Sequence, residues 1–131
     1  MVEADPRPDR FRDLMLDNEP GFEDVMSCVF GIKDHEVRTY LELLDRPGST
    51  VAELAESLDR DRSNVNRSLS TLREKGLATR ERRLLDGGGH VYQYSPIPLD
   101  EARDLMHETL DEWTVYVHDR IDEFGVESLS L

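Results

Sequence analysis

The stretch TVAELAESLDRDRSNVNRSLSTLREKGL, residues 50–77, decides the fold of this chain. Its first four residues read T-x-x-E, from Thr50 to Glu53, which is typical of a capping box at the start of a helix. The apolar residues that follow recur at the spacing of one helix face. They are Val51, Leu54, Ala55 and Leu58. The sequence therefore predicts a short helix with a buried inner side.

A second helix follows after the tight turn DRD, and we expect it to run from Arg62 to Lys75. Val65, Leu69 and Leu72 lie at i, i+4 and i+7 and predict its buried stripe. Gly76 is suited to end it in a left-handed conformation. Two helices joined by about three residues are the arrangement of a helix-turn-helix.

The flanking segments complete this unit. We expect one helix at 21–30, ended by Gly31, and another from a capping Asp34 to Asp45. The inward positions of the second are Val37, Tyr40, Leu41 and Leu44. Downstream, the runs LATRERRLL and HVYQYSP flank DGGG, which predicts a β-hairpin with a flexible tip. A hairpin after a helix-turn-helix is a wing.

A last helix is expected from a capping Asp100 to about Phe124, which is roughly 37 Å long. Its apolar residues follow an alternating spacing of four and three that resembles a coiled-coil seam. They are Met106, Leu110, Trp113, Val117, Ile121 and Phe124. This seam predicts pairing with a second copy.

The predicted fold class is mainly α (α+β), a winged helix-turn-helix with a long C-terminal dimerisation helix. We expect an N-terminal arm with a short helix at 1–20, the winged unit at 21–97, and the dimerisation helix at 98–131.

The charge of the chain is unevenly distributed. Acidic residues outnumber basic ones 29 to 16, and the formal net charge is −13. Only two of the basic residues are lysines, and such a composition resembles that of proteins from salt-loving cells, although an acidic mesophile protein is the alternative. Residues 60–93 nevertheless hold eight basic residues against four acidic ones. A basic segment in an acidic chain indicates an anionic partner for that segment.

The outward side of the second helix, 62–75, suits a DNA-reading role. Arginine binds guanine and asparagine binds adenine through paired hydrogen bonds, while short serine and threonine allow close approach. The alternative is an ordinary solvated face, but arginines on the wing favour double-stranded DNA. The candidate DNA-binding residues are Arg60, Arg62, Ser63, Asn64, Asn66, Arg67, Ser70, Thr71, Arg80, Arg82, Arg83 and His90. We expect helix 62–75 in the major groove and the wing, 80–92, on phosphates or in the minor groove.

The stretch from Asp34 to Glu81 resembles the winged-helix domains of archaeal transcription regulators of the TrmB type and, more loosely, the MarR type. The shared features are a Y-L-LL first helix, a T-x-x-E-L-A second helix and a third ending L-x-x-L-x-x-K-G-L. The resemblance covers residues 22 to about 108 and implies a DNA-binding transcription regulator. Full-length TrmB proteins carry a sugar-binding domain after the long helix. The sequence ends at Leu131, so we do not expect sugar binding to carry over.

Other roles have weaker support. His107 and His118 share a helix face as in ArsR-type metal sensors, but the supporting ligand positions are Leu105 and Ile121, so no metal or other cofactor is expected. Cys28 lies among apolar neighbours and is expected to be buried rather than a redox sensor. A single cysteine, the absence of a long apolar run and a polar N-terminus favour a cytoplasmic protein with no membrane partner.

No catalytic motif is present, so the chain is not expected to be an enzyme. Two alternatives to the regulator hypothesis stay open. The first is a winged-helix module that binds other proteins, which the acidic surface would suit. The second is a regulator that responds to a metal or an oxidant.

Overall fold

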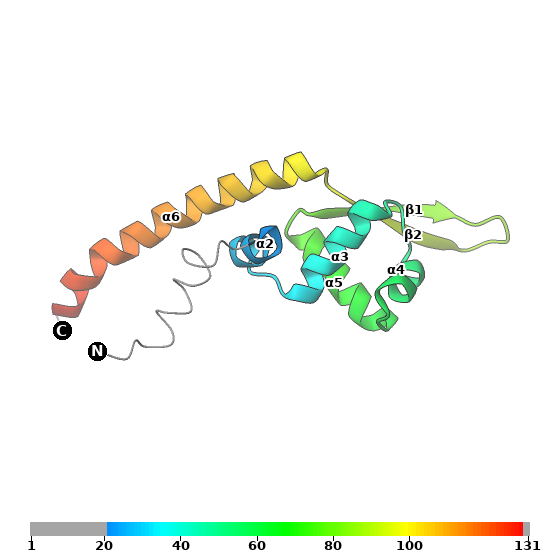
Figure 1. Cartoon of the computed structure of the whole chain (residues 1–131), viewed down its shortest axis with the longest axis horizontal. Coiled ribbons are helices and arrows are strands. Elements are labelled where there is room, and N and C mark those ends of the chain that lie inside the picture. The colour runs from blue at the N-terminus through cyan, green and yellow to red at the C-terminus, as the bar shows by residue number, and fades with distance from the viewer. Residues whose placement is uncertain (1–20, 130–131) are drawn as a thin grey trace.

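A computed structural model describes residues 21–129 of the 131-residue chain. Five helices and one hairpin make up this region, in an order that matches a winged helix-turn-helix followed by a long helix (Figure 1). The elements are α2 (Phe22–Phe30), α3 (Asp34–Asp45), α4 (Val51–Leu58), α5 (Arg62–Glu74), β1 (Ala78–Leu84), β2 (His90–Pro96) and α6 (Leu99–Leu129). The mainly helical fold class is confirmed.

The hydrophobic core lies where α3, α4 and α5 meet beneath the base of the hairpin. The predicted stripe of α5, Val65, Leu69 and Leu72, is fully buried. Leu54 of α4 and Tyr40 of α3 are fully buried as well. The Tyr40 hydroxyl donates to the backbone oxygen of Ile97 at 3.0 Å, and burial raises the pKa of Tyr40. This bond links α3 to the segment that leads into α6.

The turn between α4 and α5 fixes the angle of the second helix. Asp59 takes the left-handed conformation with φ of 54°, and the Asp61 side chain accepts a hydrogen bond from the Asn64 backbone N–H at 3.1 Å. This bond caps the N-terminus of α5. At the other end, Gly76 has φ of 77°, which glycine adopts without steric cost.

The wing is fixed to the helices at its base and extends freely at its tip. β1 and β2 pair antiparallel, with Ala78 opposite Pro96 and Leu84 opposite His90. At the base, Tyr94 exchanges backbone hydrogen bonds with the loop before α4: it donates to Ser49 at 2.7 Å and accepts from Gly48 at 2.8 Å. Residues 79–90 are all exposed.

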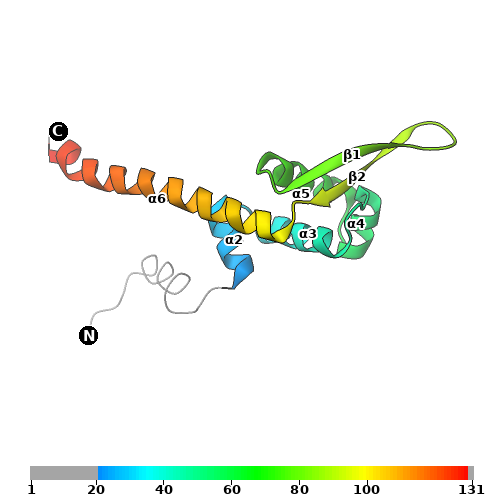
Figure 2. The same ribbon diagram turned by 90° about the horizontal axis from the view of Figure 1, so that it is seen from above.

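The long helix α6 has two unlike halves. Its first turns pack against α2, so that Ala102 and Met106 are buried in the core. Beyond Leu110 it leaves the rest of the chain and projects in the direction opposite to the wing (Figure 2). At 1.5 Å per residue its 31 residues span about 46 Å. Half of this helix therefore lacks a covering element within residues 21–129.

Several expected details differ from the structure. Lys33, not Asp34, is the N-cap of α3, because the Glu36 side chain accepts a hydrogen bond from the Lys33 backbone at 2.8 Å. Asp100 is the second residue of α6 rather than its cap. Leu43 is fully buried in α3, whereas the expected Leu44 is half-buried.

Cys28 is exposed, which contradicts the expected buried position. Met26 and Phe30 supply the buried face of α2 instead, and Cys28 lies between them on the other side of the helix. The short helix expected within 1–20 lies outside the described residues. None of the helices in the described region is both long and apolar enough to cross a membrane.

Candidate nucleic-acid interface

The outward face of α5 is polar and accessible along its length. Ser63, Arg67 and Ser70 are exposed, as the helical spacing predicts, and Asn66 is exposed beside them. The Arg67 guanidinium donates a hydrogen bond to the Asn64 side chain one turn earlier. This bond holds the guanidinium near the N-terminal half of α5, where a reading helix contacts base edges.

The inward side of α5 is fastened by a polar contact that the apolar pattern does not reveal. Ser68 is fully buried, and its hydroxyl lies 3.0 Å from His35 Nδ1 on α3. A buried hydroxyl without a partner would destabilise the fold, so this pair both satisfies Ser68 and ties α5 to α3. The rotation of α5 about its own axis is therefore set by a hydrogen bond as well as by leucines.

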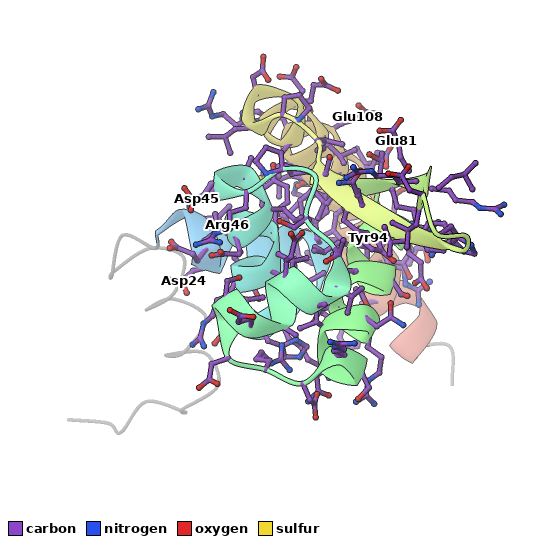
Figure 3. The ribbon with its side chains drawn as sticks, turned by 90° about the vertical axis from the view of Figure 1, so that its right-hand side faces the viewer. Asp24, Asp45, Arg46, Glu81, Tyr94 and Glu108 are labelled. Carbon is purple, nitrogen blue, oxygen red and sulfur yellow. The ribbon has the colours of Figure 1, made fainter. Side chains whose placement is uncertain are left out.

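The two faces of the wing carry different side chains. Side chains alternate along a strand, so the register places Arg80, Arg82 and Leu84 on one face and Glu81 and Arg83 on the other. The first face continues into the core through Tyr94, and we call it the inner face. Figure 3 shows Tyr94 directed toward the helices and Glu81 directed away from them. Arg83 is thereby separated from Arg80 and Arg82.

Aromatic rings hold Arg80 in place on the inner face. Its guanidinium carbon lies 4.0 Å from the centroid of the Tyr92 ring, which is a cation–π contact. The adjacent Tyr94 side chain raises the pKa of Arg80. His90 packs its ring edge-on against Tyr92, with centroids 5.3 Å apart. The inner face therefore presents a positive charge in a fixed position.

A groove of about 560 Å³ separates this inner face from α5. Arg62, Ser63 and Asn66 line one wall, and Arg80, Tyr92 and Tyr94 line the other. The first residues of α4, Thr50, Val51 and Ala52, line it as well. The helix and the wing thus present their polar and basic groups across one shared opening.

A second hollow, of about 530 Å³, lies on the opposite flank of α5 against the start of α3. It is lined on one side by Arg60, Asn64, Arg67, Ser70, Thr71 and Glu74, and on the other by Lys33, His35 and Glu36. Arg60, Asn64 and Thr71 are half-buried. Among the described residues, Arg60 Nη1 is a buried side-chain atom with no hydrogen-bond partner. Basic groups therefore lie on both sides of α5, and in this second hollow they are accompanied by two carboxylates.

Two acidic side chains lie far from this surface. Asp24 on α2 and Asp45 on α3 project from the side of the molecule opposite the wing (Figure 3). Glu36 and Glu74, however, line the second hollow, and Glu81 lies on the other face of the wing, so acidic groups border the basic ones here.

Sequence reasoning missed three kinds of lining residue. The sequence pattern gave Thr50 a capping role and Val51 a place on the buried side, although a capping box also exposes the first backbone N–H groups of a helix. Tyr92 and Tyr94 were assigned only to the hairpin, although alternate residues share a face. Lys33 and His35 gave no local signal, because the fold alone brings the start of α3 to α5.

The sequence profile of the family described as sugar-specific transcriptional regulator TrmB matches residues 26–100. The chain belongs to the TrmB family. The matched region runs from α2 to the start of α6 and contains both walls of the groove. A curated relative from Methanocaldococcus jannaschii is 33% identical over 108 residues, which are 82% of this chain and 82% of the relative.

Two solved structures share the fold of this chain. A possible transcriptional regulator from Methanosarcina mazei is 28% identical, with a TM-score of 0.69 over 77% of this chain and 86% of that one. A MepR variant from S. aureus, solved bound to an oligodeoxyribonucleotide, is 15% identical, with a TM-score of 0.52 over 98% of this chain and 92% of that one. The second likeness shows the fold alone, and both neighbours are consistent with the expected winged helix.

The expected seam of α6 is exposed only along some of its length. Met106 is 8% exposed because it packs within the core, and Val117 is half-buried. Leu110, Trp113, Ile121 and Phe124 are between 40% and 71% exposed. Tyr116 flanks this stripe at 61% exposure. We call Leu110, Trp113, Tyr116, Ile121 and Phe124 the α6 stripe.

The two histidines of α6 differ in their surroundings. His107 borders an apolar groove of about 190 Å³ between α2 and α6, and His118 is exposed farther along the helix. Within residues 21–129, no three His, Cys, Asp or Glu side chains lie close enough together to hold a metal ion.

Proposed function

We propose that this TrmB-family protein is a sequence-specific DNA-binding transcription regulator that acts as a homodimer. The observation that carries the proposal is the shared groove. α5 exposes Ser63, Asn66 and Arg67, and the inner face of the wing presents Arg80 across the opening. A phosphate backbone entering this groove would meet positive charge on one side, while base edges would face the outward side of α5.

The geometry of the two elements supports one docking arrangement. α5 lies in the major groove, with Arg67 donating two hydrogen bonds to a guanine and Asn66 able to pair with an adenine. Arg62 and Arg80 neutralise phosphates that border the same groove. The MepR variant solved with an oligodeoxyribonucleotide shares the winged fold and supports DNA as the ligand class.

Two copies would pair through the α6 stripe. The exposed aromatic and aliphatic residues of the stripe would lose contact with water when a second α6 covers them. Pairing would set two α5 helices about one turn of DNA apart on a palindromic site. Nothing in the groove offers a catalytic arrangement, so we propose no enzymatic activity.

The proposal is tested by selecting duplexes from random sequence with the purified full chain in concentrated potassium chloride. Recovery of one enriched palindromic motif, with micromolar or tighter binding by anisotropy, supports it. Equal retention of all sequences, or no retention at any salt concentration, refutes sequence-specific binding.

The inner and outer faces of the wing give a matched pair of variants. Arg82→Ala is expected to weaken binding to all sequences about equally and to reduce the salt slope by about 1, as loss of one phosphate contact does. Arg83→Ala removes the same charge from the outer face and is expected to change affinity less than about twofold. Anisotropy titrations at several salt concentrations measure the affinity and the salt slope of each variant. Equal losses in the two variants would contradict the assignment of faces.

Adaptation to high salt predicts a shallow salt dependence. At 1 M salt the screening length is about 3 Å, so phosphate neutralisation loses most of its value. The acidic surface can also take up cations when DNA binds, which opposes counterion release. We expect the logarithm of the binding constant to fall less steeply than about −0.9 per phosphate contact. A titration that gives the full slope for the basic residues of the groove would argue against this adaptation.

A further inference from the structure

Two leucines are exposed at the tip of the wing. Leu84 is 73% exposed and Leu85 is 44% exposed. Leu84 is the last residue of β1, and Leu85 begins the turn that Gly87, Gly88 and Gly89 complete. Covering apolar side chains this accessible with a partner is favourable, because it removes their surface from water. The core holds no place for them, because residues 79–90 all lie outside it.

The register shows which way Leu84 faces. It lies opposite His90 and two residues beyond Arg82, so it shares the inner face with Arg80 and Arg82. From the base outward, this face presents buried Tyr94, then the guanidinium groups, and finally Leu84 beside His90. An apolar group thus lies at the far end of a basic strip that starts in the groove beside α5.

We propose that Leu84, with Leu85 next to it, enters the minor groove as an apolar wedge and bends the duplex at a flexible base step. This inference rests on the proposed DNA-binding function. Apolar side chains that enter a minor groove push apart two stacked base pairs and kink the duplex. The additional contacts that the protein makes to the bent DNA offset the cost of unstacking. A wedge of this kind reads deformability, so it favours TA or CA/TG steps without hydrogen bonds to bases.

The charges beside the leucines favour DNA over a protein as the occupant. A protein surface that covered Leu84 would also have to cover the Arg82 guanidinium on the same face, and a buried cation needs an acidic partner. A minor groove meets both requirements at once, because phosphates line its two edges and its floor admits apolar groups. The glycine turn allows the tip to follow the local width of the groove.

The test uses a duplex that the full wild-type chain selects from random sequence. The duplex carries donor and acceptor dyes at its ends and a fluorescent adenine analogue at the step under the wing tip. The variants are Leu84→Ala and the double variant Leu84→Ala with Leu85→Ala. Leu99→Ala is the matched control, because it removes a leucine that is 37% exposed at the start of α6, away from the tip.

The wild-type protein and Leu99→Ala are expected to bend the duplex and to raise the fluorescence of the adenine analogue. Leu84→Ala should lose roughly half of the bend or more, and the double variant should lose the fluorescence change. Affinity should fall about 3- to 10-fold for sites with a flexible step and less than about twofold for sites with a stiff A-tract there. Thermal unfolding should be unchanged, because both side chains are exposed.

Bending by the double variant equal to that of the wild type would overturn the wedge, as would a wild-type complex with straight DNA. In either case α5 could still read its site, and the proposed function would stand. A double variant that binds and bends DNA normally but loses a protein partner would assign the tip to protein contact and would also overturn the wedge. No binding of DNA by the wild-type chain would instead refute the proposed function itself.

Discussion

Replacing Trp113 and Ile121 together by glutamate is expected to leave the chain monomeric and to lower its affinity for a two-half-site operator at least about 100-fold. Both side chains belong to the α6 stripe, at 56% and 61% exposure. A paired α6 would bury two carboxylates from each copy against apolar groups, at a cost of several kcal/mol. Without the paired α6 helices, each copy binds its half-site independently. The gain in affinity that comes from tethering the second copy close to its half-site then disappears.

Val115→Glu is the matched control for this variant. Val115 is as exposed as Ile121, at 62%, but it lies across the helix from Trp113. The Val115→Glu variant is therefore expected to leave the dimer intact. Light scattering after size exclusion measures the mass of each variant in solution. Anisotropy with full operators and with single half-sites measures how much binding at one half-site strengthens binding at the other. A monomeric wild type, or a dimer that survives both glutamates, would contradict pairing through the stripe.

Arg67→Ala is expected to weaken binding to the preferred operator by about 1–3 kcal/mol, which is roughly a 5- to 150-fold loss. The loss should be confined to sites that carry one particular base pair, because a bidentate contact to guanine discriminates against the other bases. The variant should therefore bind a site changed at that position as tightly as the original site. Anisotropy with every single-base variant of the operator measures both effects.

Arg73→Ala controls for loss of charge on the same helix. Arg73 is exposed in the last turn of α5 and lies on a different face from Arg67. Its removal should leave the base preference unchanged. Arg67→Lys should recover charge but not discrimination, since an ammonium cannot donate in the paired geometry of a guanidinium. Unchanged affinity of Arg67→Ala at every site would remove Arg67 from the reading surface.

The sequence predicted the winged helix-turn-helix because its signals are local and agree with one another. Apolar spacing fixed the inner side of α5, the T-x-x-E pattern fixed the start of α4, and a glycine run marked the hairpin. The outward residues of α5 followed directly, since a helix with a known inner side has a known outer side. TrmB family membership, expected from the same residues, is confirmed.

Tertiary contacts determined what local patterns did not. Ser68 is buried because His35 reaches it from α3, and no local pattern encodes a partner 33 residues away. Cys28 has apolar neighbours in sequence but lies on the solvent side of α2, because its position around the helix, not the composition of the segment, decides which way its side chain faces. The groove needs the start of α4, α5 and the wing together, so only the folded chain reveals it.

The backbone hydrogen bonds of Tyr94 divide the wing into a rigid base and a compliant tip. Deuterium should replace the Tyr94 amide proton slowly, since its release requires opening of the Ser49 pairing that joins the wing to the helices. The amides of Asp86 and Gly87 should exchange fastest among the wing residues, because they lie in the exposed turn at the tip. Bound DNA would then slow exchange most at the tip, and the entropy lost on binding would be concentrated in those few residues.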